Sequence, residues 1–361
     1  MSYRLQWGLP TRLALGVVTV LVLGAALVAA SGANPVSAAV GLFLGAFGER
    51  YMIGETILSA TPLAIIALGV IPALRAGVFT VGSEGQLIFG AIAATATVLA
   101  LPGQPPVVLL PAGAIAGMLG GMAWAILPAL LRAYARVNEI LSTLLLNYIA
   151  TSVLVLLVRT VMRSGMRDAV PHSPDLPDAA LLPKVLSGTR LHVGVLLVFV
   201  AVSLLAWWLK SFRGFTFDVF ARRPDLAARM GLSEPRAVIV TMLVAGAAAG
   251  LVGWMQVAGV TGTLYTSVSG GLGFTGIVVA LLGGLRPAGT LLAALFFGAL
   301  ATGADGLQAG SGVPASISTV IEGLLLLVAA LTFVGGARAR TEKPPESPSK
   351  EALPSQSGAL P

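Results

Sequence analysis

The sequence predicts an all-α protein, a polytopic membrane helical bundle with about ten transmembrane helices, some of them interrupted or half-length. Of its 361 residues, 56% are hydrophobic and 10% are charged, whereas a soluble domain carries about 25% charged residues. The mean hydropathy is +0.92, and the apolar residues fall in runs long enough to cross a bilayer. These observations exclude an ordinary soluble enzyme.

Ten apolar segments are candidate spans, because a transmembrane helix needs about 20 apolar residues, with a range of about 17–25. The segment that begins at Phe274 is about half that length, which predicts a half-helix or a re-entrant piece. A signal peptide is the alternative for the first segment, but its apolar stretch exceeds the ~7–15 residues typical of one, so we expect a retained span. The ten segments are Leu13–Ala30, Ile57–Leu74, Leu87–Leu101, Val107–Leu131, Ile140–Val158, Leu191–Leu209, Ala237–Val260, Phe274–Leu285, Ala288–Thr302 and Ala315–Val334.

The Lys and Arg residues predict that both termini lie in the cytoplasm. Alternation of the spans from a cytoplasmic N-terminus leaves a minority of the 22 Lys and Arg residues outside, as the positive-inside rule requires. Residues 1–335 then form the transmembrane domain, with a cytoplasmic loop at 211–236 and an ordered outer loop at 163–190. Residues 336–361 are predicted to be a disordered cytoplasmic tail. The outer cations are Arg50, Arg159, Arg163, Arg167, Lys184 and Arg190.

The rare residue types limit the chemistry. The chain has no Cys and two His, which excludes disulfides, thiolate nucleophiles, and metal sites built from Cys or His. No phosphate-binding Walker A sequence is present either, so this chain cannot hydrolyse ATP itself. We therefore predict no catalytic residue, no metal site and no cofactor in this chain.

Glycines recur on single helix faces, at Gly113, Gly117 and Gly121 and again at Gly246 and Gly250. This spacing lets helix backbones approach each other closely. We expect tight packing within the subunit, and a dedicated subunit interface is the alternative.

Two glycine-rich segments interrupt the apolar runs, one in each half of the chain. The first is RAGVFTVGSEGQ at 75–86, and the second is GGLGFTG at 270–276, followed by GGLRP at 283–287. Irregular backbone at membrane depth is tolerated only where protein or water satisfies its N–H and C=O groups. Paired interruptions therefore predict a substrate path. The alternative is that both are hairpin turns between fully spanning helices.

Polar residues at and between the interruptions are the candidates for lining this path. Glu84 needs a partner at membrane depth, and we expect Arg75 or the free N–H groups of the following helix to supply it. Direct substrate contact is the alternative for Glu84, and interhelical hydrogen bonding is the alternative for Asn147, Tyr148, Gln256 and Glu322. The candidate path residues are Ser83, Glu84, Gln86, Asn147, Tyr148, Gln256, Phe274 and Thr275.

A short cytoplasmic helix is encoded at Pro224–Gly231. It has Pro at its start, Asp225 in its first turn, Arg229 in its last turn and Gly231 as its stop. A helix of about two turns is unstable alone in water. We therefore expect it to dock on another protein, with the membrane surface as the alternative.

Four strings, in this order, resemble a permease subunit of bacterial ATP-binding cassette (ABC) importers of the ribose and branched-chain amino-acid type. Within that group, the NEI and LNYIA runs resemble the larger of two permeases in nucleoside or simple-sugar uptake systems. The resemblance covers roughly residues 55–335. The strings are RAGVFTVGSEGQ at 75–86, VNEILSTLLLNYIA at 137–150, PDLAARMG at 224–231 and GFTGIVVALLG at 273–283.

The resemblance implies a multi-pass protein of the bacterial inner membrane that forms a heterodimer with a second homologous permease. It also implies a cytoplasmic subunit that binds ATP and Mg²⁺, a substrate-binding lipoprotein outside, contact with membrane lipid and no nucleic acid. Ala221 and Arg223 stand where the family has Gly and Asn, which leaves the detailed contacts of the coupling helix open. The implied coupling residues are Arg223, Pro224, Asp225, Ala228, Arg229 and Gly231.

Two other classes of function compete with an importer subunit. A self-sufficient secondary transporter would use Glu84, Asp305 or Glu322 as proton or cation sites. An intramembrane enzyme lacks support, because both His172 and His192 lie near the outer loop and no serine has a plausible His base. The exact solute is not specified by these residues.

Overall fold

The computed structural model describes most of the chain between residues 34 and 311. The described residues are 34–165 and 170–311, with Val18, 22–26, 28–30, Gly32, Val320 and Gly323. Several sequence predictions lie partly or wholly outside these residues: half of the span Leu13–Ala30, nearly all of the span Ala315–Val334, the tail 336–361, Arg167 and Glu322.

The described part of the chain is helical and holds no strand, with two isolated β-bridges as its only β pairing. Short 3₁₀ turns η1 (Asp178–Ala180) and η2 (Val193–Val195) lie in the outer loop and at the start of α7, and a π-helix η3 (Gln256–Thr261) extends α10. The α-helices are α2 Pro35–Phe47, α3 Arg50–Arg75, α4 Ser83–Leu99, α5 Pro106–Ala135, α6 Glu139–Arg159, α7 Leu196–Lys210, α8 Phe212–Phe220, α9 Pro224–Arg229, α10 Glu234–Met255, α11 Leu272–Leu282 and α12 Pro287–Ser311.

Six helical stretches are long and apolar enough to cross a membrane: α3, α5, α6, α7 together with η2, α10 together with η3, and α12. A seventh span results where Val22–Ala30 and Pro35–Phe47 count together as one bent span. The predicted number of about ten is not reached among the described residues. Helices α4 and α11 fall below the length of a span, and the predicted terminal spans lie half or almost wholly outside the described part. The sequence analysis also missed α2, although Asn34 caps its first turn and Pro35 begins it.

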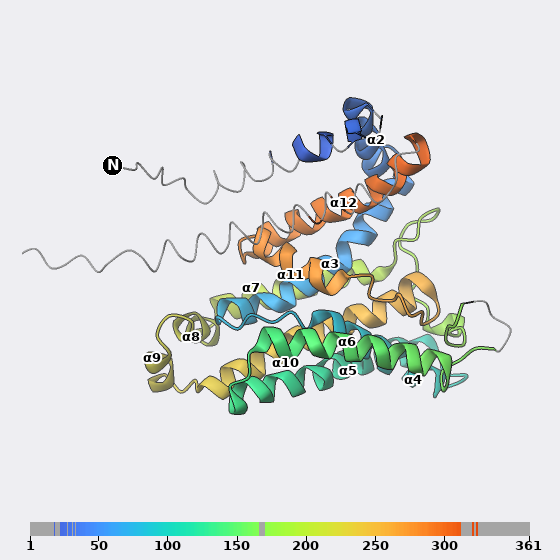
Figure 1. Ribbon diagram of the computed structural model, residues 1–361. Helices are drawn as coiled ribbons and strands as arrows, with labels where there is room; N and C mark the ends of the chain where they lie inside the picture. Colours follow the sequence, from blue (N-terminus) through green and yellow to red (C-terminus); the bar gives the residue numbers. More distant parts are fainter. Residues whose placement is uncertain are drawn as a thin grey trace, which may run out of the picture.

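Helix α3 forms the centre of the bundle (Figure 1). Every residue from Leu63 to Leu74 is buried, although Pro62 and Pro72 interrupt its hydrogen bonding. Helices α4, α5 and α10 pack together and α10 also packs on α3, while α11 and α12 cover α3 on its other side and α2 packs on α12. A helix that is apolar on all faces requires such a central position.

The glycine faces on α5 and α10 bring the two helices into backbone contact. A Cβ placed on Gly121 would lie 2.1 Å from the backbone oxygen of Gly246, and one on Gly250 would lie 2.1 Å from that of Gly117. Gly113 instead lies against the indole of Trp254 on α10. The prediction of tight packing within the subunit is therefore confirmed for these helices.

Replacing Gly121 with Leu should destabilise the fold, because the new side chain meets backbone that cannot rotate away. Overpacking of a core costs about 1–3 kcal/mol, and here both helix axes would have to separate. We expect a lower thermal unfolding midpoint and less monodisperse protein after solubilisation in mild detergent. Ala123→Leu is the matched control, because Ala123 lies on the exposed face of the same helix. Equal midpoints for the two variants would contradict this packing.

Candidate functional site

The two glycine-rich interruptions meet at the carboxylate of Glu84. Glu84 lies in the first turn of α4, and its carboxylate accepts hydrogen bonds from Gly271 N at 3.1 Å and Gly273 N at 2.8 Å, at the start of α11. A Cβ on Gly273 would lie 2.3 Å from Glu84 N, so only glycine permits this approach. Each helix N-terminus carries about +0.5 charge. One carboxylate therefore neutralises two facing helix ends.

This half-helix junction, defined as Gly82–Gln86 with Gly270–Gly273, lies at membrane depth. Asn147, which bonds to it, is eight residues beyond the start of α6 at Glu139, or about 12 Å along a helix that rises 1.5 Å per residue. Next to the junction, a Cβ on Gly276 would lie 2.5 Å from Ile66 in the middle of α3. The geometry favours interrupted helices over hairpin turns at the membrane surface.

Helix α6 fixes the first interruption in place. Asn147 accepts a hydrogen bond from Gly85 N at 3.0 Å and donates one to Val81 O at 2.9 Å. The side chains of Ser83 and Gln86 are buried, and their polar atoms have no hydrogen-bond partner among the described residues. Neither expected partner of Glu84 is the observed one: Arg75 pairs with Asp218, and the N–H groups that bind Glu84 belong to the start of α11 and not to the helix that follows Glu84.

A polar pocket of about 260 Å³ lies on the other side of the Gly270–Gly273 backbone. Gly270 and Leu272 line it, while the N–H groups of Gly271 and Gly273 face Glu84. Helices α3, α11 and α12 and the π-helix form the other walls. The side chains that offer hydrogen bonds to its interior are Glu55, Ser59, Arg190, Gln256 and Thr275.

Three of these polar lining residues were not predicted from the sequence. Glu55 and Ser59 lie one helical turn apart on α3, and this i, i+4 spacing within an apolar run is a signal that could have found them. Arg190 donates from Nε to Glu55 at 3.0 Å, across 135 positions of sequence, for which no local signal exists. Hydrogen bonding to Glu55 raises the pKa of Arg190, so the guanidinium stays charged.

The described residues of the loop at 163–190 form a cap over the π-helix, and the placement of this cap outside the membrane stays a prediction. Leu182 N donates to Ala258 O at 2.8 Å, and Leu176 N donates to Gly262 O at 2.9 Å.

His192 packs so closely on the π-helix that a Cβ on Gly259 would lie 2.3 Å from Nε2 of His192. Burial lowers the pKa of His192 to about 4, so this contact involves a neutral ring at neutral pH. π-Helices are common at functional sites, and this one presents Gln256 to the pocket.

The loop at 211–236 folds into α8 and α9 at the far end of α3. Arg75, the last residue of α3, forms an ion pair with Asp218 of α8, with Nε donating at 2.7 Å. The short helix α9 covers Pro224–Arg229, and Gly231 adopts a φ of +87° just beyond it. Ala227 is fully buried where α9 packs on α8, whereas Leu226 is 50% exposed. Helix α9 therefore has one anchored face and one open face.

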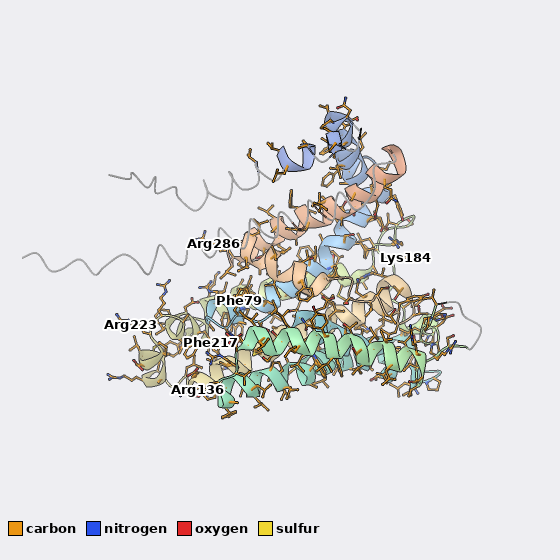
Figure 2. All side chains as sticks on the ribbon, in the orientation of Figure 1. Phe79, Arg136, Lys184, Phe217, Arg223 and Arg286 are labelled. Atoms are coloured by element: carbon orange, nitrogen blue, oxygen red, sulfur yellow. The ribbon has the colours of Figure 1, made fainter. Side chains whose placement is uncertain are left out.

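The predicted coupling residues lie on this open face. Arg223, Pro224, Asp225, Ala228 and Arg229 are all exposed, as is Gly231. Arg223 lies at the same end of the molecule as Arg136 and Arg286, and Lys184 lies at the opposite end (Figure 2). Their contact with an ATPase stays a prediction.

The predicted path residues fall into three groups. Ser83, Glu84, Gln86 and Asn147 belong to the half-helix junction, and Gln256 and Thr275 line the pocket. Tyr148 is 73% exposed on the outer surface of α6, and Phe274 is 38% exposed, so neither joins these two groups. The role of all these residues in transport stays a prediction.

Removing the carboxylate of Glu84 should weaken the half-helix junction. Glu84→Ala leaves two buried N–H groups without an acceptor, and hydrogen bonds to charged groups contribute about 1.5–3 kcal/mol each. We expect a loss of about 2–4 kcal/mol, a smaller loss for Glu84→Gln, and faster proteolysis near residue 270. Glu49→Ala is the control, because Glu49 is exposed and its side chain makes no cap hydrogen bond. An unchanged unfolding midpoint and proteolysis rate in Glu84→Ala would contradict the bridging role.

Comparisons with known proteins agree with a membrane permease. Residues 52–330 match the family described as the permease component of branched-chain amino acid transport systems. The chain is 33% identical to the guanosine ABC transporter permease protein NupP of Bacillus subtilis, over 81% of this chain and 84% of that protein. It is 31% identical to the nucleoside ABC transporter permease protein NupB of Lactococcus lactis, over 83% of this chain and 85% of that protein.

An archaeal protein is similarly related. The chain is 33% identical to the glucose ABC transporter permease protein TsgB13 of Haloferax volcanii, over 81% of this chain and 80% of that protein. No solved structure matches the chain. The family match covers more than half of the sequence and the helices are those of a multi-pass membrane protein. The chain therefore belongs to the family of permease components of branched-chain amino acid transport systems.

Proposed function

We propose that this chain is a permease subunit of an ATP-driven ABC importer, and that its pocket passes an uncharged polar solute such as a nucleoside or simple sugar. The observation that carries this proposal is the chemistry of the pocket. Ser59, Gln256 and Thr275 offer neutral hydroxyl and amide groups, and the two charged residues at the pocket, Glu55 and Arg190, neutralise each other. The named relatives transport guanosine, nucleosides and glucose.

The pocket favours a neutral solute over an ion. A bound cation needs several oxygen ligands, and a bound anion needs unpaired N–H groups or Arg and Lys side chains. Within the described residues, the Gln256 amide makes no hydrogen bond. A solute with hydroxyl and amide groups can therefore take hydrogen bonds there without displacing an ion pair.

Helix α3 provides a mechanical link between the pocket and the proposed ATPase contact. Its outer half carries Glu55 and Ser59, and its last residue, Arg75, holds α8 through Asp218. Helix α9 packs on α8, which in turn contacts α3. A movement imposed on α9 by a cytoplasmic ATPase would thus reach the pocket wall through α8 and the buried helix α3.

The proposal includes the remaining parts of an importer. ATP and Mg²⁺ are held by a separate cytoplasmic subunit, a lipoprotein delivers the solute from outside, and a second permease faces this one across the path. Bacillus subtilis NupP and NupQ are both named as guanosine permease proteins and both resemble this chain, which supports a pair of permeases. The α8–α9 end is then cytoplasmic, in a bacterial inner membrane, with both termini on that side.

The structure supports a self-sufficient secondary transporter less well than an importer subunit. Glu84 accepts two hydrogen bonds from the N-terminus of α11, so its carboxylate already has a structural role in the half-helix junction. Asp305 lies exposed on α12. Neither Glu84 nor Asp305 lines the pocket. Among the described residues, these two proposed ion sites are therefore separate from the solute path.

Gln256→Leu should impair uptake of the solute without unfolding the protein. The substitution keeps the side-chain size and removes one amide, and a hydrogen bond contributes about 0.5–1.5 kcal/mol. We expect KM for ATP-dependent uptake of guanosine or glucose to rise about threefold to tenfold in proteoliposomes that hold the complete importer. Gln308→Leu, on an exposed position of α12, should leave KM unchanged. Uptake that survives ATP depletion would refute the importer itself, whereas an unchanged KM in Gln256→Leu would refute only the pocket.

Reversing charge on the open face of α9 should uncouple ATP hydrolysis from uptake. Asp225→Arg changes an exposed side chain next to the exposed Leu226 and leaves the buried contact of Ala227 intact. Solute-stimulated ATPase activity should fall while the chain still inserts and assembles. Asp178→Arg makes the same charge change at the opposite, outer end and should have no effect. Full stimulation in Asp225→Arg and also in Leu226→Glu would argue against docking through α9.

A further inference from the structure

A second cavity, distinct from the polar pocket, opens as a groove between α7 and α10. It has a volume of about 370 Å³, and its lining is apolar except for Thr241, whose hydroxyl donates to Ala237 O within α10. Helix α3 forms the floor, with Ile65, Leu68 and Gly69 among the lining residues. Such a groove in a membrane-spanning region must be filled by lipid chains or by protein.

The shape of the groove follows from unequal helix packing. A Cβ on Gly69 would lie 2.2 Å from the Cβ of Ala248, so α3 and α10 are in close contact at the floor. Helix α7 is far more open, because only 17% of its apolar window is buried. The side chains of Val200 and Leu204 on α7 and Val244 on α10 line the groove and remain exposed.

Three cationic side chains share helix faces with residues that line one end of the groove. Lys210 follows the lining residue Trp207 by three positions on α7. Arg236 precedes the lining residue Val240 by four positions on α10, and Arg213 precedes Phe217 by four on α8. Residues three or four apart share a helix face. The three cations therefore flank the α8–α9 end of the groove.

These three cations form no ion pair among the described residues. Lys210, Arg213 and Arg236 are exposed and form no ion pair there. The nearby acids are already in use, because Asp218 pairs with Arg75, and Glu234 lies 3.7 Å from Arg132. Trp207 and Trp208 at the same end provide amphipathic rings of the kind that gather at lipid headgroups.

We propose that the groove is a binding site for an anionic phospholipid of the membrane leaflet at the α8–α9 end. One acyl chain lies in the groove between α7 and α10, and the headgroup phosphate lies among Lys210, Arg213 and Arg236. The size of the groove favours a chain over a protein helix. A spanning helix about 10 Å wide and 30 Å long fills roughly 2,000 Å³, whereas the groove holds about 370 Å³.

Native mass spectrometry of the assembled importer tests the headgroup contact. The complex is delipidated in detergent and offered equal amounts of dioleoylphosphatidylglycerol and dioleoylphosphatidylcholine. We expect roughly a hundredfold preference for the anionic lipid, since three cations that each contribute about 1 kcal/mol near a lipid surface together contribute about 3 kcal/mol. The triple variant Lys210→Gln, Arg213→Gln and Arg236→Gln should lose this preference. The double variant Arg136→Gln and Arg286→Gln removes exposed cations at the same end, away from the groove, and should keep it.

A second variant tests the acyl-chain contact separately from the charge. Val244→Trp fills the groove and should reduce bound lipid severalfold, whereas Leu292→Trp, on a 70% exposed position of α12, should not. A preference that persists in the triple variant would overturn the headgroup site. Bound lipid unchanged by Val244→Trp, or efficient cross-linking of Val244→Cys to another subunit, would overturn the groove as a lipid site and identify it as a protein interface.

Discussion

The hydrogen bonds of the Glu84 carboxylate to Gly271 and Gly273 join the two glycine-rich interruptions of this protein. Without them, two helix N-termini would face each other inside a membrane with like partial charges and no water to satisfy their N–H groups. A charged carboxylate inside a membrane normally destabilises the folded protein. Here one negative charge is matched by two positive helix ends, so the charge stabilises the arrangement that surrounds it.

The polar pocket depends on this arrangement. The backbone from Gly270 to Gly273 presents N–H groups to Glu84 on one side and forms the pocket wall on the other. Helix α3 closes the opposite wall and is tied at both ends, to Arg190 of the outer cap through Glu55 and to Asp218 of α8 through Arg75. The pocket, the cap and helix α8 thus all contact the buried helix α3. This helix gives a physical route for coupling between the two ends of the molecule.

The sequence predicted the elements of this site better than their pairing. Glycine-rich interruptions, the caps of α9 and the apolar runs are local patterns, and the structure places helices and breaks where these patterns occur. The expected partners of Glu84 were Arg75 or the N–H groups of the helix that directly follows it, and both were wrong, because the partner Gly271 lies 187 positions away along the chain. Arg75 proved to be paired with Asp218 instead.

Pocket residues on regular helices were the hardest to predict. Ser59 and Glu55 lie within the long apolar helix α3, and only the position of Arg190 in the folded cap reveals which face of α3 is polar. Tyr148 follows Asn147 directly, yet a step of one residue on a helix turns the side chain by about 100°. It is therefore exposed, while Asn147 reaches the half-helix junction.

The central claim is that solute occupies the pocket next to the half-helix junction, and thiol labelling tests it most directly because the chain has no cysteine. Single cysteines at Ser59 and at Ser83 are exposed to a water-soluble maleimide in vesicles that hold the complete importer, with and without guanosine or glucose. The account predicts that the Ser59→Cys variant is labelled and that the transported solute protects it, while Ser83→Cys in the buried junction reacts far more slowly. Rapid labelling of Ser83→Cys together with an inert or unprotected Ser59→Cys would place the solute path elsewhere and contradict the account.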